Sequence, residues 1–282
     1  MRTVVITGAS RGVGRAAAEA FAKEGCRLML NCRSNFDMLE AVAAELRESC
    51  EVITVHGPFT KEIFQQYLGA PVDWNMPYQM APDDLNTPKR AGKDNRRKLA
   101  SNLAEVQETA TGKEDGQNDQ DEIVLINNGG ISTFHLAQDV PDEEFAAMIE
   151  ANLGTMFRMT RALIPYLLHA GGRILNVSSV WGVTGASMET VYSLTKGGVN
   201  AYTRALAKEL APNHIPVNAL ALGCVDTDMN GWMSKEDRAQ VEDEIPFGRM
   251  ATPKECAEML LLLSHAPRYL TGQVIDFDGA WI

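Results

Sequence analysis

The sequence predicts an α/β fold in which a parallel sheet carries helices on both faces, the doubly wound arrangement. Three observations carry this prediction. Short apolar runs of strand length alternate with longer stretches of helical period along most of the 282 residues. A glycine-rich turn, Thr7–Gly14, follows the first apolar run and opens the first helical stretch. Hydrophobic residues make up 45% of the chain, which is enough for the core of one such domain.

The expected elements follow one another in a regular order. Strands are expected at the apolar runs Thr3–Ile6, Arg27–Asn31, Glu51–Val55, Ile123–Ile126, Arg173–Val177, Pro216–Leu220 and Val274–Phe277. Helices are expected at the stretches of helical period Gly14–Glu24, Asp37–Glu48, Asp142–Leu168, Val191–Leu210 and Pro253–Leu263. Parallel strands need such crossover connections. We therefore expect a single Rossmann-type domain over residues 1–282.

One connection is much longer than an ordinary crossover. It runs from Val55 to Ile123, and its unusual part, residues 62–98, alternates prolines with aromatic and methionine residues before a basic run at Lys89–Lys98. Leu99–Thr109 has helical character and is expected to be the normal crossover helix. Residues 62–98 are therefore predicted to be an insertion within the domain, between the third and fourth strands.

Charge and cysteine usage narrow the class of protein. The formal net charge is −11, which argues against a general affinity for nucleic acid. The five cysteines form no Cys-x-x-Cys pair, so we expect reduced thiols, and the five histidines make no pattern of metal ligands. No apolar run is long enough to span a membrane, and the first strand begins too early for a signal peptide. A cytoplasmic protein is predicted.

The glycine-rich turn predicts a dinucleotide site. In Thr7-Gly8-Ala9-Ser10-Arg11-Gly12-Val13-Gly14 the glycines let the backbone turn tightly and approach a pyrophosphate. The helix that follows offers free N–H groups and the positive end of its dipole. A strand before the turn and a helix after it are the context that such a site requires. A glycine-rich turn without a ligand is the alternative.

The end of the second strand favours NADP(H) over NAD(H). A carboxylate there would hold the ribose 2′-hydroxyl of NAD, but the strand ends in Asn31-Cys32-Arg33-Ser34. The guanidinium groups of Arg33 and Arg11, with the Ser34 hydroxyl, suit the 2′-phosphate of NADP(H). A solvated loop cation is the alternative reading of Arg33.

Tyr192 and Lys196 lie one helical turn apart, so their side chains share one face of the predicted helix. A phenol has an unperturbed pKa of about 10, and a neighbouring cation lowers that pKa. Tyr192 could therefore exchange a proton with an alcohol or ketone oxygen near neutral pH. A tyrosine and a lysine at this spacing also occur together by chance in many helices.

In combination, these motifs resemble those of the short-chain dehydrogenase/reductase family, over nearly all of the chain except roughly residues 62–98. The matching residues are the TGxxxGxG turn Thr7–Gly14, the NNxG turn Asn127–Gly130, Asn152, Ser179, and Tyr192 with Lys196. Within the family, Asn176–Gly182 and Ile245–Arg249 are most similar to the branch of 3-oxoacyl-carrier-protein reductases and hydroxysteroid dehydrogenases. Three segments depart from the family pattern: Gly129 replaces an alanine, Leu222-Gly223 replaces Pro-Gly, and His56-Gly57-Pro58 stands where an aspartate usually touches adenine.

The resemblance implies a role for each of these residues. Tyr192 would be the general acid or base, Ser179 would bind the substrate oxygen, and Lys196 would lower the pKa of Tyr192 and hold the nicotinamide ribose. Asn152 would hold a water that links Lys196 to solvent, or it is a structural residue that bonds neighbouring backbone. The expected contacts to NADP(H) are Gly8, Ser10, Arg11, Gly12, Val13, Gly14, Arg33, Ser34, Asn128, Gly129, Tyr192, Lys196, Val225 and Thr227.

The substrate wall is expected to be apolar. Beside Ser179 and Tyr192, the expected substrate contacts are Trp181, Met188, Met229 and Trp232. The segments that are expected to form this wall, Val180–Glu189 and Met229–Gln240, contain no lysine or arginine before Lys235. Such a wall suits a flat, apolar cyclic ketone or alcohol, such as a steroid or a flavonoid-like compound. It disfavours a small anionic substrate. Some of these residues could instead belong to the core or to a subunit interface.

Three functions stay open at this point. The first is NADP(H)-dependent interconversion of a ketone and a secondary alcohol. The second is 3-oxoacyl-carrier-protein reduction, which expects a basic docking surface that only Lys89–Lys98 offers. The third is a non-catalytic NADP(H)-sensing regulator, although such proteins typically lose the tyrosine or the lysine. The resemblance also implies a homotetramer or dimer formed through the helices Asp142–Leu168 and Val191–Leu210.

The insertion has its own candidate roles. Its basic run could add contacts to the 2′-phosphate, and Trp74–Met80 could form a lid or an oligomer contact. A solvated loop is the alternative.

Overall fold

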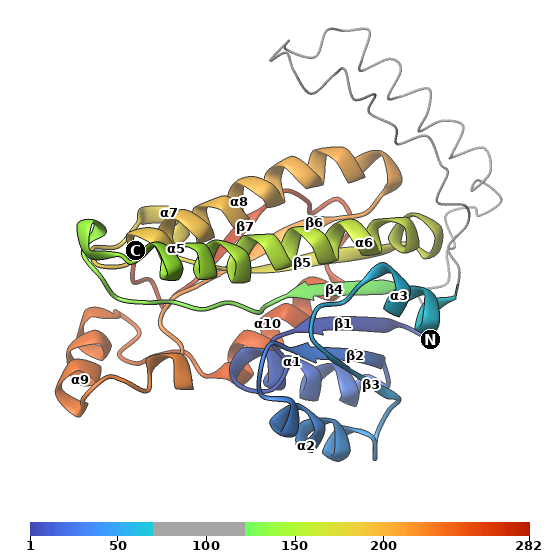
Figure 1. The fold of residues 1–282 in the computed structure, drawn as a ribbon, viewed down its shortest axis with the longest axis horizontal. Helices are drawn as coiled ribbons and strands as arrows, with labels where there is room; N and C mark the ends of the chain where they lie inside the picture. Colours follow the sequence, from blue (N-terminus) through green and yellow to red (C-terminus); the bar gives the residue numbers. More distant parts are fainter. Residues whose placement is uncertain (70–121) are drawn as a thin grey trace, which may run out of the picture.

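The computed structural model describes residues 1–69 and 122–282 and contains a seven-stranded sheet in which every strand pairs in parallel with its neighbours (Figure 1). The predicted fold class is therefore confirmed. Along the sheet the order is β3-β2-β1-β4-β5-β6-β7. The strands are β1 (Thr3–Thr7), β2 (Arg27–Cys32), β3 (Val52–His56), β4 (Ile123–Asn127), β5 (Gly172–Ser179), β6 (Val217–Leu222) and β7 (Val274–Phe277).

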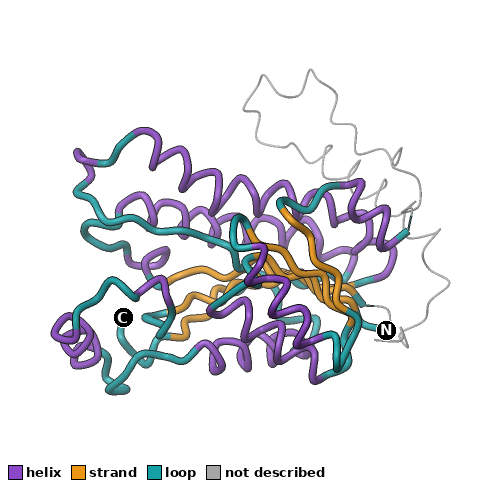
Figure 2. The backbone as a smooth tube through the Cα atoms, turned by 60° about the horizontal axis from the view of Figure 1, so that its bottom comes forward, coloured by secondary structure: helices purple, strands orange, loops and turns teal. Residues whose placement is uncertain are grey.

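Helices cover both faces of the sheet, with a hydrophobic cluster under each cover (Figure 2). On β1, Val4 and Ile6 join the cluster beneath one set of helices, whereas Val5 points to the other, as the two-residue period of a strand requires. The first set is α1 (Gly12–Lys23), α2 (Phe36–Leu46) and α10 (Pro253–His265). The second set is α3 (Lys61–Leu68), α6 (Thr155–Ala170) and α8 (Thr190–Leu210).

The sheet order reverses direction between β1 and β4. Chain order proceeds outward from β1 to β2 and β3 on one side, and from β4 to β7 on the other. The connections that follow β1 and β4 therefore separate at this point and leave a crevice at the carboxyl ends of the strands, where ligands of such folds bind. The glycine turn, the Asn127–Gly130 turn and Ser179 all lie at this edge.

The helix predicted over Asp142–Leu168 is interrupted by a wider turn. The structure has α5 (Asp142–Ile149), then a π-helical turn η4 (Glu150–Gly154), then α6. In the turn, the Thr155 N–H bonds to the carbonyl oxygen of Glu150, five residues earlier, instead of four. Asn152 lies buried in this turn, and α6 keeps its apolar face on the core.

The start of the predicted insertion is a helix. In α3 the Thr60 hydroxyl caps the N-terminus by accepting from the Ile63 N–H, and Phe64 is fully buried against the core. The remaining residues on which the insertion was predicted, together with Trp74–Met80, Lys89–Lys98 and the expected helix Leu99–Thr109, lie outside the described residues.

Two further helices border the crevice. The four-residue helix α7 (Trp181–Thr184) follows β5, and α9 (Lys235–Glu244) follows β6. Ser234 begins α9 with a capping box, in which its hydroxyl accepts from the Asp237 N–H and the Asp237 carboxylate accepts from the Ser234 N–H.

Within the described part of the chain, no helix combines the length and apolar character needed to cross a bilayer.

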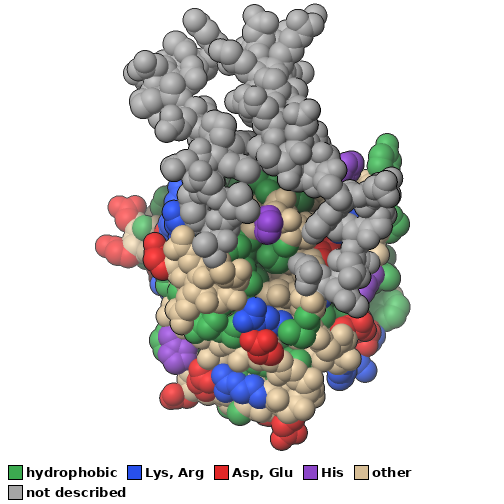
Figure 3. All heavy atoms as spheres, turned by 90° about the vertical axis from the view of Figure 1, so that its right-hand side faces the viewer, with side chains coloured by type: hydrophobic (Ala, Val, Ile, Leu, Met, Phe, Trp, Pro, Cys, Tyr) green, Lys and Arg blue, Asp and Glu red, His purple; other side chains and the backbone are tan. Residues whose placement is uncertain are grey.

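A buried ion network holds the opposite edge of the sheet. Glu122 precedes β4, and its carboxylate lies 3.2 Å from the Arg2 guanidinium, 3.1 Å from that of Arg173 and 3.1 Å from that of Arg268. Glu122 and Arg173 are buried. Acidic and basic side chains also lie close together on the surface at this end of the molecule (Figure 3). The network joins β1, β4, β5 and the segment after α10.

Candidate active site

The turn after β1 is built for close approach of backbone to a ligand. Gly8 and Gly12 have φ of +65° and +56°, a region that favours glycine. A Cβ on Gly8 would lie 2.9 Å from the Gly129 Cα, and one on Gly14 would collide with the Gly8 carbonyl oxygen. The Thr7 hydroxyl accepts from the N–H groups of Asn128 and Gly129, each at 2.9 Å, and so joins this turn to the one after β4.

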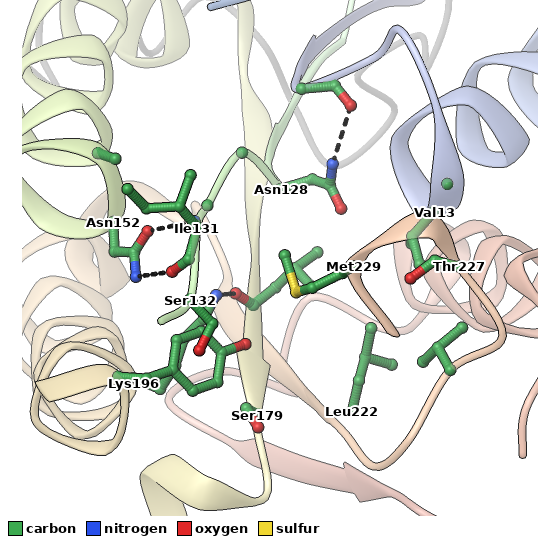
Figure 4. Close-up of a pocket in the computed structure, with 18 of the residues that line it drawn as sticks. Val13, Asn128, Ile131, Ser132, Asn152, Ser179, Lys196, Leu222, Thr227 and Met229 are labelled. Carbon is green, nitrogen blue, oxygen red and sulfur yellow. Dashed lines mark hydrogen bonds between the residues drawn. The ribbon is translucent and has the colours of Figure 1, made fainter. Parts of the chain in front are cut away.

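The far side of the crevice comes from the loop after β6. A Cβ on Gly12 would lie 3.4 Å from Thr227, and the Arg11 guanidinium pairs with Asp228 at 3.5 Å. Val13 and Thr227 lie on one side of the pocket, and Asn152 and Lys196 lie on the other (Figure 4). The narrow cradle between these groups, with glycines where a side chain would strain or fill it, fits a dinucleotide.

At the adenine end, Arg33 and Ser34 are exposed and line the cavity. His56 does not line it, since its ring stacks on Phe36 with centroids 4.6 Å apart and bonds to Glu40 at 3.1 Å. Gly57 and Pro58 therefore border the cavity where the family pattern would place an aspartate.

The crevice forms one cavity of about 770 Å³. It gathers the four expected catalytic residues and nearly all of the expected binding residues. Two of the expected residues do not line it. Gly14 is buried behind the glycine turn, where its missing side chain lets α1 pack against Gly8. Met188 is exposed and has φ of +62°, and it contributes its carbonyl oxygen, which accepts from the His135 N–H at 2.8 Å.

Ser179, Tyr192 and Lys196 converge within the cavity. Ser179 ends β5 and hydrogen-bonds to Tyr192, while its oxygen also accepts from the Trp181 N–H at 3.2 Å. Tyr192 and Lys196 project from the first turns of α8, and the Lys196 Nζ lies 5.5 Å from the centre of the Tyr192 ring. The tyrosine hydroxyl and the serine hydroxyl can therefore contact the same substrate oxygen.

The pKa of Tyr192 differs from the sequence-based expectation. Burial raises it above the ordinary value, the negative charge of Glu189 raises it further, and the hydrogen bond with Ser179 opposes both. The Lys196 Nζ lies 5.5 Å from the centre of the ring and donates to the Val177 carbonyl oxygen at 3.0 Å. Burial lowers the pKa of Lys196 itself to about 8.

Asn152 is fixed by three hydrogen bonds. Its amide oxygen accepts from the Ile131 N–H at 2.8 Å, and its amide nitrogen donates to the Ile131 carbonyl at 2.9 Å (Figure 4). The amide nitrogen also donates to the Thr195 hydroxyl at 3.0 Å. A Cβ on Gly130 would lie 3.2 Å from the Asn152 amide oxygen and 3.6 Å from the Lys196 Nζ. Asn152 thus bonds neighbouring backbone, the structural role that the sequence left open, and it lies beside the lysine.

Behind the reacting groups, α7 is packed directly on α8. The Ser178 hydroxyl donates to the Asn200 side chain at 2.6 Å, and the Asn200 amide donates to the Gly182 carbonyl at 2.9 Å. A Cβ on Gly182 would lie 2.5 Å from the Lys196 carbonyl carbon. The glycine therefore sets the separation between Ser179 and the helix that carries Tyr192 and Lys196.

On the substrate side of the cavity, two expected tryptophans pack on aromatic residues that the sequence did not single out. Trp181 packs on Trp281 with ring centroids 4.9 Å apart, and Trp232 packs on Phe134 with ring centroids 4.6 Å apart. Glu189 also lines the cavity, and its carboxylate accepts from the Ser132 hydroxyl at 2.8 Å. The spacing of Glu189, one turn before Tyr192, could have identified it.

All five cysteines are free, as the sequence predicted. In the part of the chain that the structure describes, no cluster of three or more histidine, cysteine, aspartate or glutamate residues could hold a metal ion.

Comparison with known proteins agrees with this geometry. A family model described as short chain dehydrogenase matches residues 2–68, and one described as Enoyl-(Acyl carrier protein) reductase matches residues 102–281. An uncharacterized oxidoreductase, YmfI, of Bacillus subtilis is 34% identical over 99% of this chain and 98% of its own. The 3-oxoacyl-(acyl-carrier-protein) reductase FabG of Thermotoga maritima is 32% identical over 100% of this chain and 98% of its own. Nodulation protein G of Azospirillum brasilense is 30% identical over 99% of this chain and 97% of its own.

The fold, the site and these relatives define an NAD(P)-dependent oxidoreductase that acts on CH–OH groups. The chain belongs to the short-chain dehydrogenase/reductase family, in the branch that resembles 3-oxoacyl-(acyl-carrier-protein) reductases. The resemblance inferred from the sequence motifs is confirmed.

Proposed function

We propose that this protein uses NADP(H) to interconvert a ketone and a secondary alcohol on an apolar cyclic substrate. The observation that carries the proposal is the convergence of Ser179, Tyr192 and Lys196 in one cavity with the glycine turn. A small-molecule ketone or alcohol is the expected partner.

Each residue would have a distinct role in ketone reduction. The nicotinamide would supply the hydride. Tyr192, held protonated by its raised pKa, would donate a proton to the carbonyl oxygen, and Ser179 would hydrogen-bond that oxygen as negative charge develops. Lys196 would hold the nicotinamide ribose, and Asn152 would keep the segment around Ile131 in place beside it.

A flat ring system suits the walls of the substrate side. Two pairs of packed aromatic rings, Trp181 with Trp281 and Trp232 with Phe134, border the cavity together with Met229. Aromatic walls favour face and edge contacts with a rigid apolar ligand.

Replacement of Tyr192 tests the mechanism. Tyr192→Phe removes the proton donor and keeps the ring, so we expect the rate of ketone reduction to fall about 10²–10⁴-fold. The measurement is loss of NADPH absorbance with a panel of cyclic ketones, and NADPH binding to the variant should persist. Activity equal to wild type would rule out this role for Tyr192.

The choice of NADP(H) is supported by Arg33 and Ser34, which border the cavity where NAD-selective relatives would need a carboxylate. In Arg33→Ala we expect the KM for NADPH to rise about tenfold or more while the KM for NADH stays constant. Arg47→Ala, at the C-cap of α2 and away from the cavity, is the matched control. An equal change for both cofactors would contradict the assignment.

A second candidate, reduction of 3-oxoacyl groups on a carrier protein, is favoured by the printed activity of the FabG relatives. Among the described residues, both acidic and basic side chains line the cavity, Glu189 and Glu244 as well as Arg11, Arg33 and Arg158. The basic run that was predicted to dock an acidic carrier, with Arg96 and Arg97, lies outside the described chain. Turnover of an acyl-carrier substrate, lost when Arg96 and Arg97 are neutralised, would support this candidate.

NADPH binding without turnover of any substrate would favour the third candidate, a non-catalytic NADP(H)-sensing regulator.

We also propose a homo-oligomer, a tetramer or dimer, in the cytoplasm. The helices α5, α6 and α8 expose Phe145, Phe157 and Leu194, which an interface would cover. The five free thiols suit a reducing compartment. Light scattering of the purified protein would give the state, and a monomer at micromolar concentration would contradict the oligomer.

A further inference from the structure

The Glu189 subsite, defined as Glu189 with Ser132 and Trp181, places a carboxylate in the substrate side of the cavity. The Ser132 hydroxyl donates to the carboxylate at 2.8 Å, and the Trp181 side chain donates a second hydrogen bond. These three residues come from the segment after β4, from α7 and from the residue before α8. Three separate segments therefore orient one partly buried acid toward the ligand space.

Beyond the hydrogen bonds from Ser132 and Trp181, the carboxylate has no structural task that would explain its position. Glu189 is the N-cap residue of α8, but its side chain does not cap the helix. The turn around it is held by backbone, through a short bridge with His135 and the bond from the His135 N–H to the Met188 carbonyl. Within the described chain it pairs with no lysine or arginine. A partly buried acid without a cation costs free energy, so a purpose beyond packing is expected.

The carboxylate also has capacity left for a ligand. An ionised carboxyl group can accept about four hydrogen bonds, and Ser132 and Trp181 supply two. Tyr192 lies one helical turn further along and lines the same cavity, so both side chains are open to one ligand. Trp181 both bonds the carboxylate and packs on Trp281, which joins the acid to the aromatic wall.

We propose that the Glu189 subsite determines specificity by accepting a hydrogen bond from a hydroxyl group on the ring of the substrate, and by rejecting a carboxylate at that position. The inference rests on the proposed function and narrows its substrate to hydroxylated cyclic ketones and the corresponding diols. A buried acceptor rejects a ligand that lacks the donor, because the acceptor is then left unsatisfied.

The test uses tetralones, which are bicyclic aromatic ketones. At each ring position in turn, three analogues that carry a hydroxyl, a methoxyl or a carboxylate group are compared. The kcat/KM for each is measured with NADPH for wild type, Glu189→Gln and Ser132→Ala. Glu144→Gln is the matched control, because Glu144 pairs with the nearby His135 at 3.0 Å but does not line the cavity. Quenching of tryptophan fluorescence in the NADP⁺ complex gives the affinity for each tetralone independently of turnover.

We expect wild type and Glu144→Gln to prefer the best hydroxytetralone over its methoxyl analogue by about tenfold or more. Glu189→Gln keeps an uncharged acceptor, so this preference should fall severalfold, and the carboxylate analogue should become a better ligand. Ser132→Ala should weaken the preference less. The same preference in Glu189→Gln as in wild type would overturn the subsite.

The binding measurement separates the two proposals. If no tetralone or other ketone is reduced, the proposed function fails, yet a hydroxyl preference in affinity that depends on Glu189 would still support the subsite. If ketones are reduced and neither rate nor affinity distinguishes the hydroxyl in a Glu189-dependent way, the subsite is wrong and the proposed function stands.

Discussion

The amine of Lys196 lies in a nearly dry position on α8, where it donates to the Val177 carbonyl. Burial lowers its pKa from 10.5 to about 8. Between these values the unfolded chain holds a proton that the folded protein has lost. The free energy of unfolding contributed by this group therefore rises with pH in that window. At neutral pH the buried charge is therefore a cost to the fold.

Replacing this lysine should separate stability from activity. We expect Lys196→Met to be inactive but to raise the free energy of unfolding of the ligand-free protein at pH 7 by about 1–3 kcal/mol. The advantage should shrink as pH rises through the window from about 8 to 10.5. Urea unfolding at several pH values measures it, with Lys208→Met, an exposed position on the same helix, as control. A difference that does not change with pH would contradict the shifted pKa.

The charge of Glu189 should also shift the pH dependence of catalysis. Glu189 is faced by Tyr192 on α8 and by Cys224 after β6, and the His135 ring beside it is paired with Glu144. Because the negative charge raises the pKa of Tyr192, Glu189→Gln should lower that pKa. Ketone reduction, which needs protonated Tyr192, should then decline at lower pH than in wild type, and alcohol oxidation should rise at lower pH. Superimposable pH profiles would show that the charge is not sensed by Tyr192.

At the scale of elements, the contact between α7 and α8 sets the active-site geometry. The two helices approach so closely at Gly182 that a Cβ would lie 2.5 Å from the Lys196 carbonyl carbon. Across the same contact, a Cβ on Gly197 would meet its nearest neighbour, the Gly182 carbonyl oxygen, at an ordinary 3.6 Å. The two glycines therefore differ sharply in the space around them although they face each other.

This difference predicts opposite outcomes for the same substitution. Gly182→Ala should push α7 away and displace Ser179 from Tyr192, with a fall in kcat of about 10²-fold or more. Gly197→Ala should keep activity and stabilise α8 by about 1 kcal/mol, since alanine is the better helix former. Thermal unfolding and steady-state kinetics of both variants give the comparison. Loss of activity in both, or in neither, would contradict the packing argument.

At the scale of the whole molecule, the Glu122 network joins elements that are distant in the sequence. Removing the charge in Glu122→Gln would leave the buried Arg173 and the partly buried Arg2 without their ionised partner. We expect a loss of about 3–5 kcal/mol in the free energy of unfolding. Glu258→Gln, which breaks only an exposed pair with Lys254, should change it by less than about 0.5 kcal/mol. Equal effects in urea unfolding would show that the network contributes no more than a surface pair.

Much of this architecture could be predicted because its signals are local. Apolar runs such as Ile123–Ile126 can be recognised as central strands, since they are buried on both faces. The glycine turn stands out by its spacing and context, and Tyr192 with Lys196 stands out once it is combined with that turn, Asn152 and Ser179. Ser132, Phe134 and Trp281 could not be predicted in this way, because only the order of strands in the sheet brings the turn after β4 and the end of the chain to one cavity. Met188 was assigned to the cavity because its left-handed backbone conformation has no signal in the sequence.

The number of residues in the wide turn η4 determines how Asn152 is oriented relative to α6. A regular helix advances by about 100° per residue, so deleting one residue from Glu150–Gly154 would rotate one side of the turn against the other by that angle. If α6 kept Met159 and Leu163 in the core, the Asn152 amide would swing away from Ile131. A single-residue deletion there should thus give a protein that still folds yet has lost the brace beside its lysine, so we expect the deletion to spare the fold and to lower activity.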